Sequence, residues 1–469
     1  MRNKKDYLWT LIGKFLPQLL YLITVMILAR FLSPDDFGTI GILSVFILVA
    51  NTIMDAGLGG SLIKESVVSK EDYNTIATFN YFVSILLYLL IVLFAPLIES
   101  FYEVEGLSKI IILLSLIFII NAVGLVPLAK LSREFQFKEI SWANIFSVIV
   151  ASILAILSAY KGLGVYSLVI YQIAQNLIRS LFLKIYSKYL YHIQFKISSF
   201  KKLISFGLFT TFVNVIDTFY ENLLVAIFGK SLGVAEAGYL SQAKKIEEVS
   251  TVSVIQTINM TSFPILSKIK DDLYQFKKEA HSIFLTFCLI LFPAVIAISV
   301  YSEIIVTIIF GGDWIKSSGY LSLLCIAGLF IIMENLNRNF IKSLGRATEL
   351  FYVTIIKRAF GIGIILLAIF IDIKYALIGY IISSFVAFLF NQIVYCSLAK
   401  ERYVEFFRRL LMVIIPSLIL YLLLYVCYIF IQSIVSRITI AVVILVVYYV
   451  VLLYFSNKEK LMSYIKKRR

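Results

Sequence analysis

The chain has 469 residues, of which 61% are hydrophobic and 15% are charged. A soluble domain carries about a quarter charged residues and could not bury this much apolar surface, so the composition excludes an ordinary soluble protein. The apolar residues come in blocks of about twenty, the length that a helix needs to cross the hydrocarbon core of a bilayer. The sequence therefore predicts an all-α integral membrane protein with about 14 transmembrane helices.

The apolar blocks follow one another along the chain with short polar connections between them. The predicted spans are residues 8–30, 37–61, 76–98, 108–129, 141–160, 165–186, 203–229, 236–262, 280–301, 318–343, 348–371, 375–399, 409–432 and 437–456. The eighth span is the least apolar, because Lys244, Lys245, Glu247 and Glu248 lie inside it. It is retained because its removal would reverse the side of the membrane on which every later connection lies.

Lysine and arginine are distributed unevenly between the connections. Positive charge is retained on the cytoplasmic side of a membrane, and the N-terminus, the even-numbered connections and the C-terminal tail hold most of these residues. The odd-numbered connections and their edges hold one each, namely Arg30, Lys109, Lys161, Lys230, Lys316, Lys374 and Arg437. Both termini are therefore predicted to be cytoplasmic. The net charge of +15 reflects this topology and attraction to anionic membrane lipids, and no nucleic-acid-binding module is present.

Residues suited to catalysis or metal binding are sparse. The two histidines, His192 and His281, have no Cys or His partner at metal-ligand spacing. The four cysteines lie within predicted spans, where they behave as small apolar residues. Neither a phosphate-binding loop nor a nucleophile elbow is found. The sequence thus predicts a protein without enzymatic activity or a cofactor, whose function resides in the membrane.

An internal repeat divides the chain. At an offset of 200 residues, the segment 29–40 aligns with 229–240 and matches Leu32 with Leu232 and Gly38 with Gly238. At an offset of 213, the segment around Arg133 aligns with that around Arg346. The predicted organisation is a six-helix lobe (1–186), a cytoplasmic interfacial linker (187–202), a second six-helix lobe (203–400), and two extra helices with a basic tail (401–469). Lobes of equal orientation imply a pseudo-two-fold axis along the membrane normal.

Polar side chains inside the spans are the candidate functional residues. Each costs about 2.5–3.5 kcal/mol at the bilayer centre and therefore faces a cavity or a partner. These residues are Lys14 and Gln18 in the first span, Asp55 in the second, Asp217 and Glu221 in the seventh, Gln242, Lys245 and Glu248 in the eighth, and Glu334 and Arg338 in the tenth. Most of them lie in the opening pair of spans of each lobe, which favours a shared cavity.

A structural role is the alternative for each of these residues. Lys245 with Glu248, and Glu334 with Arg338, have the spacing of ion pairs within one helix. Lys14 can extend to the cytoplasmic surface from inside the first span. Lys357 and Arg358, in the eleventh span, would lie at the membrane surface if that span begins later than residue 348.

Six strings of residues occur in the order typical of one family. They are ARFLSPDDFGTIGI, DAGLGGSLIKES, LAKLSREFQFK, AGYLSQAKKI, FPILSKIKDD and FGGDWIKSSGYLSLL. Together they resemble the signatures of bacterial polysaccharide transporters, the Wzx-type lipid-linked oligosaccharide flippases related to the colanic and teichuronic acid exporters. The resemblance extends from about residue 9 to about residue 345.

The resemblance implies the fold of the multidrug, oligosaccharidyl-lipid and polysaccharide exporter superfamily, with two six-helix lobes around a central cavity. It implies a substrate, an oligosaccharide repeat unit on undecaprenyl pyrophosphate, which crosses the bacterial cytoplasmic (inner) membrane. A polysaccharide polymerase and other assembly proteins are the expected partners, besides membrane lipids. A cation-coupled multidrug antiporter of the same superfamily is the alternative, and a membrane glycan polymerase or ligase is a third, which the short outer connections disfavour.

Roles for the candidate residues follow from this substrate. Cations bordering the cavity are suited to the pyrophosphate, and Lys14, Arg30 and Lys245 are the favoured ones, with Gln18, Gln242 and Arg338 as further cavity residues. Arg30 and Lys230 have an equal alternative as anchors at the outer surface. Coupling to a proton or sodium gradient would require a carboxylate, and Asp217 with Glu221 is favoured over Asp55, Glu248 and Glu334.

Overall fold

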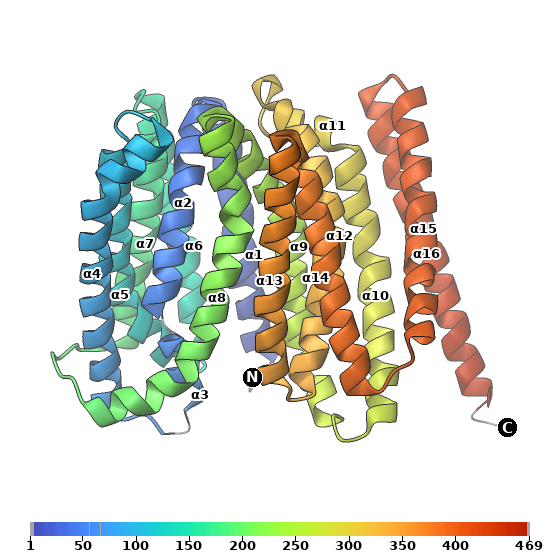
Figure 1. The fold of residues 1–469 in the computed structure, drawn as a ribbon, viewed down its shortest axis with the longest axis horizontal. Coiled ribbons are helices and arrows are strands. Elements are labelled where there is room, and N and C mark those ends of the chain that lie inside the picture. Colours follow the sequence, from blue (N-terminus) through green and yellow to red (C-terminus); the bar gives the residue numbers. More distant parts are fainter. Residues whose placement is uncertain (1–3, 56, 66, 467–469) are drawn as a thin grey trace. The chain divides into compact units, whose positions relative to one another are not determined.

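The computed structural model describes residues 4–55, 57–65 and 67–466, and helices account for almost all of them (Figure 1). The long helices are α1 (Lys4–Leu28), α2 (Pro34–Asp55), α4 (Lys70–Tyr102), α5 (Leu107–Arg133), α6 (Phe137–Tyr160), α7 (Tyr166–Ser187), α8 (Ile197–Ser231), α9 (Val234–Lys268), α10 (Leu273–Val300), α12 (Lys316–Ser343), α13 (Ala347–Ile371), α14 (Ala376–Ala399), α15 (Tyr403–Phe430) and α16 (Ile434–Lys466). Short helices are α3 (Leu58–Lys64), α11 (Ser302–Ile309), η1 (Gly312–Trp314) and η2 (Ile373–Tyr375).

Each predicted span overlaps one long helix, and the second, residues 37–61, also runs from α2 into the short helix α3. In the described part of the chain, 11 helices are long and apolar enough to cross a membrane. Helices α7 and α9 are not among these, because they carry several polar and charged residues, and the apolar part of α16 is the shorter stretch Ile434–Val450. The all-helical multi-pass class is thus confirmed, whereas the number of 14 crossings stays a prediction.

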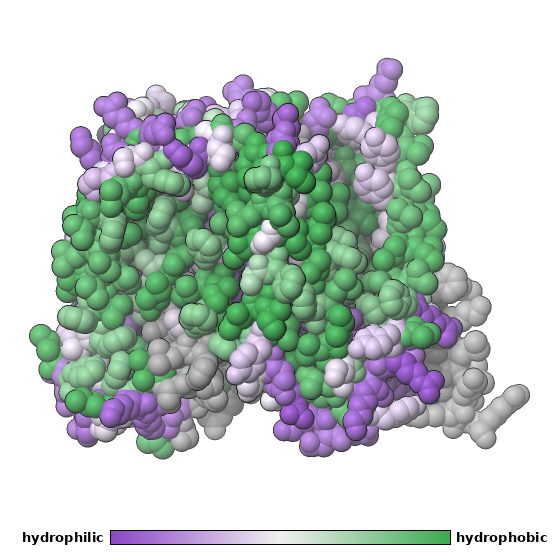
Figure 2. Space-filling view, in the orientation of Figure 1, coloured by the Kyte–Doolittle hydropathy of each residue, from purple (hydrophilic) through white to green (hydrophobic). Residues whose placement is uncertain are grey.

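Large apolar side chains cover the outward faces of these helices. Leu93 of α4 and Phe370 of α13 expose 69% and 91% of their surface. Figure 2 shows apolar side chains over the middle of the helices and polar side chains at their ends. Apolar surface on this scale would not be tolerated in water. It is the surface expected of helices in contact with lipid tails.

Helix ends coincide with local capping signals. Ser69 and Asp72 form a capping box at the start of α4, in which the Ser69 side chain accepts from the backbone N–H of Asp72 at 3.1 Å. Asp272 caps α10 by accepting from the backbone N–H of Tyr274 and Gln275 at 3.0 and 3.1 Å. Such caps satisfy N–H groups that have no partner inside the helix.

The chain folds into two compact units. Unit 1 consists of Met1–Gln242 with Ile309–Gly311, and unit 2 of Ala243–Ile308 with Gly312–Arg469. In unit 1, α5 packs against α4 and α7, α6 packs against α1 and α7, and α8 packs against α2. In unit 2, α12 packs against α10 and α14, α13 against α14, and α10 against α15. Lobes defined by the internal repeat need not share these boundaries, so the predicted division at 187–202 stays a prediction.

The connection between α7 and α8 runs along α4 in an extended conformation. Tyr189 donates from its hydroxyl to Oδ1 of Asn74 at 2.8 Å. The backbone N–H of Gln194 donates to Oγ1 of Thr78 at 3.2 Å, and this hydroxyl donates to the carbonyl oxygen of Gln194 at 3.0 Å. The bonds satisfy backbone groups that the extended segment would otherwise leave without partners, and they fix the segment on unit 1.

Candidate substrate-binding site

A polar cluster joins three helices inside unit 1. Arg179 of α7 donates from Nε to Oδ1 of Asn144 on α6 at 2.9 Å. Asn144 donates from Nδ2 to the carbonyl oxygen of Gly13 on α1 at 3.3 Å. Arg179 is a charged residue within a predicted span but was not among the predicted site residues. Because Asn144 is neutral, this bond leaves the positive charge of Arg179 without an opposite charge.

Close packing of α1 on α6 sets the position of Lys14. A Cβ placed on Gly13 would lie 2.1 Å from Oγ of Ser141, so only glycine allows this approach. Ser141 also donates to the carbonyl oxygen of Trp9 at 2.7 Å. Lys14 directly follows Gly13 and is half-buried, as is Gln18 one turn later. Within the described residues, neither Lys14 nor Arg179 forms a salt bridge, so α1 and α7 each contribute a cation without an acidic partner.

The other predicted residues of unit 1 lie in different surroundings. Asp217 is 8% exposed, whereas Glu221, one turn along α8, is exposed. Asp55 ends α2 and accepts a hydrogen bond from the backbone N–H of Gly59. Gln242 is buried, and its Oε1 atom accepts no hydrogen bond within the described part of the chain. The structure therefore distinguishes Asp217 from Glu221, which helical spacing alone had treated as equivalent.

Arg30 follows α1 at the end of unit 1 opposite the linker. It is exposed, and its guanidinium covers the backbone of Gly311, where an added Cβ would lie 2.5 Å from a guanidinium nitrogen. Lys230, the other suggested anchor, forms a salt bridge with Glu103 at 2.7 Å. This bond lowers the pKa of Glu103. The contacts of both cations at the end of the unit fit the anchoring alternative for them.

Unit 2 contains a buried ion cluster between α12 and α13. The carboxylate of Glu334 contacts the ammonium of Lys357 and lies 3.8 Å from the guanidinium of Arg358. The three residues are 2%, 1% and 7% exposed. Helix α13 begins at Ala347 and places both cations about three turns along the helix. The suggestion that Lys357 and Arg358 lie at the membrane surface stays a prediction.

Spacing within one helix offered ion pairs as a structural alternative for two acids. For Glu334, with Arg338 suggested on its own helix, the carboxylate also forms salt bridges to α13, and Arg338 interacts with it electrostatically. For Glu248, with Lys245 suggested, the structure shows a salt bridge to Lys244 at 3.6 Å. Lys245 itself is exposed, and Arg338 is half-buried. Two cations around one buried carboxylate leave the α12–α13 cluster with a net positive charge.

Glu247 is a further buried acid, which the sequence analysis did not select. It is 6% exposed and its Oε1 accepts from Oγ1 of Thr251 at 2.8 Å. Gly328 of α12 gives it room, since a Cβ there would lie 2.9 Å from the same oxygen. Helical periodicity offered a signal here, because Glu247 lies among the apolar positions of α9 rather than on its polar face.

Equivalent residues of the internal repeat meet inside unit 1. A Cβ on Gly38 of α2 would lie 1.8 Å from the carbonyl oxygen of Val234, and a Cβ on Gly238 of α9 would lie 2.0 Å from that of Pro34. At the offset of 200, Pro34 aligns with Val234 and Gly38 with Gly238, so the two contacts are reciprocal. Gly41 also faces its equivalent, Ser241, with 3.2 Å between the added Cβ and that of the serine. We call residues 34–41 and 234–241 the glycine crossing.

The charged residues of unit 1 indicate what kind of ligand the protein can hold. Lys14 and Arg179 lack acidic partners among the described residues, and no group of three or more potential metal ligands occurs there. The cations are suited to holding an anionic group by charge and hydrogen bonds. At Gly38 and Gly238, the glycine crossing brings the two helix backbones into direct contact.

Comparison with known proteins shows the family. A model of the polysaccharide biosynthesis protein family matches residues 27–319, and the chain belongs to this family. It is 24% identical over 329 residues to the lipopolysaccharide biosynthesis protein WzxC of Escherichia coli strain K12, with 70% of this chain and 67% of that protein covered. It is 22% identical over 352 residues to the teichuronic acid biosynthesis protein TuaB of Bacillus subtilis strain 168, with 73% and 72% covered.

A solved structure shares the fold. The lipid II flippase MurJ in an inward closed conformation superimposes with a TM-score of 0.74 at 16% sequence identity, covering 95% of this chain and 98% of that chain. The family match confirms the predicted relation to Wzx-type polysaccharide flippases, and with it a membrane transporter of polysaccharide biosynthesis rather than an enzyme. The residue assignments within the site stay predictions.

Proposed function

We propose that the protein moves oligosaccharide repeat units linked to undecaprenyl pyrophosphate across the bacterial inner membrane, from the cytoplasmic to the outer leaflet. One observation supports this proposal most: Lys14 and Arg179 are cations within membrane helices that form no salt bridge in the described part of the chain. An unpaired charge is costly away from water. A pyrophosphate that moves past these cations during transport would offset that cost. The family relation supports a lipid-linked sugar as the substrate.

The test is transport in proteoliposomes that contain the purified protein and labelled lipid-linked oligosaccharides on one face. We expect Lys14→Gln and Arg179→Gln each to lower the initial rate at least ten-fold, because a charge-assisted bond to the pyrophosphate is lost. Lys161→Gln is the matched control, since Lys161 is exposed in the connection between α6 and α7, and its rate should match that of the original protein. Full activity in both interior variants would contradict the binding role.

The same vesicles test the alternative substrate class and the energy source. A multidrug antiporter would transport organic cations rather than lipid-linked sugars, and the family model favours the sugars.

For coupling to an ion gradient we propose Asp217, because it is buried whereas Glu221 is exposed. An imposed proton or sodium gradient should accelerate transport by the original protein but not by Asp217→Asn. An equal response in both proteins would exclude coupling through Asp217.

Alternating access requires a closure at each membrane face, and we place the outer closure at the glycine crossing. It lies at the ends of α2 and α9 that follow Arg30 and Lys230, two of the basic residues assigned to outer connections. The closest contacts at Gly38 and Gly238 are with backbone carbonyl oxygens, so we place the separation of the two helices at these positions. The polar cluster of unit 1 would then open to the outer face.

The proposed orientation has its own test. Both termini and the linker should face the cytoplasm, so single cysteines at Lys109, Lys316 and Arg437 should react with an impermeant maleimide added to intact cells. A cysteine at Lys201, near the start of α8 after the linker, should react only after lysis. The opposite pattern of labelling would overturn the assignment of the two faces.

A further inference from the structure

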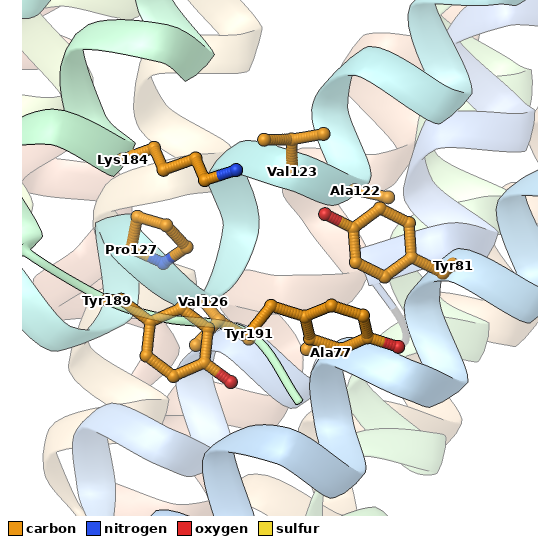
Figure 3. A pocket seen from close by; sticks show the side chains of 9 residues that line it. All are labelled: Ala77, Tyr81, Ala122, Val123, Val126, Pro127, Lys184, Tyr189 and Tyr191. Carbon is orange, nitrogen blue, oxygen red and sulfur yellow. The ribbon is translucent and has the colours of Figure 1, made fainter. Parts of the chain in front are cut away.

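A pocket outside the polar clusters opens beside the extended linker. It is a narrow depression that is partly open rather than an enclosed cavity. Its floor is made by Ala77 of α4 and by Ala122, Val123, Val126 and Pro127 of α5, and its walls by Tyr81, Lys184, Tyr189 and Tyr191 (Figure 3). The pocket thus combines an apolar floor with aromatic walls and a single charged side chain.

The linker fixes two of the aromatic walls. Tyr189 donates to Oδ1 of Asn74 and Tyr191 donates to Oγ1 of Thr78, at 2.8 and 3.3 Å. The rings of Tyr81 and Tyr191 lie 4.9 Å apart between centroids. Because these hydroxyls are engaged with α4, the pocket keeps its shape without a ligand. Two other polar groups of the pocket are therefore the ones that can bind a ligand.

Those groups are the ammonium of Lys184 and the hydroxyl of Tyr81. In Figure 3 both are directed toward the space between the walls. Within the described residues, neither group has a hydrogen-bond or ion-pair partner in the protein. Both can donate, and no carboxylate or amide side chain lines the pocket. The site therefore offers hydrogen-bond donors and positive charge to a ligand that supplies acceptors and negative charge.

We propose that this pocket binds the phosphate of a membrane lipid. A phosphate provides acceptors for Lys184 and Tyr81, and the glycerol or first isoprene unit attached to it would cover the apolar floor. Free phosphate lacks that apolar part. A neutral sugar would need acceptors as well as donors from the protein, which the lining does not supply. The pocket adjoins the linker that is predicted to be cytoplasmic, so the lipid would come from the inner leaflet.

Native mass spectrometry of the purified full-length protein in detergent tests this proposal. The probes are phosphatidylglycerol, undecaprenyl phosphate and inorganic phosphate, each added in a concentration series. We expect Lys184→Gln to weaken lipid binding about ten-fold, the effect of one charge-assisted hydrogen bond, and Tyr81→Phe to weaken it less. Lys201→Gln removes the same charge from an exposed residue that does not line the pocket, and should bind as the original protein does.

The probes distinguish the sources of the phosphate. Tighter binding of undecaprenyl phosphate would assign the pocket to the carrier lipid, and tighter binding of phosphatidylglycerol to bulk anionic lipid; either supports the proposal. Displacement of both lipids by an equal concentration of inorganic phosphate would overturn it, as would equal binding by Lys184→Gln and the original protein. Since the assay involves no transport, failure of the proposed flippase function would leave its outcome unchanged.

Discussion

Replacing Gly38 by valine should reduce transport of lipid-linked oligosaccharide to the background rate in proteoliposomes. A Cβ at this position would lie 1.8 Å from the carbonyl oxygen of Val234, a distance at which the two helices must separate. Because the obstacle is backbone rather than a flexible side chain, no rotamer change can relieve it. The glycine crossing would then stay open at the outer face and could not complete the transport cycle. Gly238→Val should have the same effect, because the contact is reciprocal.

Gly363→Val is the matched control, since Gly363 lies within α13 and a Cβ there meets no atom within 4 Å. Its transport rate should stay within about two-fold of the original. The open crossing can be detected directly with a cysteine at Ser241, which faces Gly41, in a chain without its four native cysteines. An impermeant maleimide should label this cysteine faster when Gly38 is valine. Normal transport by well-folded Gly38→Val protein would rule out the proposed closure.

The internal repeat was visible in the sequence, but its physical meaning was not. Alignment at an offset of 200 paired Gly38 with Gly238, and helical spans were predictable from blocks of apolar residues. Nothing in an alignment indicates that equivalent residues touch each other, because helix pairing depends on contacts between segments far apart in the chain. The reciprocal contacts of Gly38 and Gly238 explain why glycine stands at both positions.

Side-chain partners were less predictable than helices. Spacing along one helix identifies neighbours three or four residues apart, and it paired Glu334 with Arg338. Glu334 also forms salt bridges to Lys357 and Arg358, on the next long helix, and spacing within one helix cannot reveal these partners. Arg179 was missed for the same reason, since its bond to Asn144 links α7 to α6. An isolated charge in an apolar helix signals a partner on another helix without identifying it.

Replacing Lys357 by methionine should lower the free energy of unfolding by about 3–5 kcal/mol, the usual cost of removing one partner from a buried ion pair. Glu334→Gln should be at least as costly, because it leaves two cations, Lys357 and Arg358, without their carboxylate. When the detergent-purified proteins are heated, both variants should lose their monodisperse form at a lower temperature than the original protein does. The cost arises from the charge that remains, rather than from the lost attraction alone.

A double-mutant cycle separates these two causes. In the variant with both Lys357→Met and Glu334→Gln, one cation and one anion are removed together, so the loss of stability should be smaller than that of either single variant. The matched surface pair is Arg346 with Glu349, 3.2 Å apart and largely exposed, where Glu349→Gln should cost less than about 1 kcal/mol. Additive losses in the double variant would show that Glu334 and Lys357 stabilise unit 2 independently, and would contradict the assignment of a buried, charge-compensated cluster between α12 and α13.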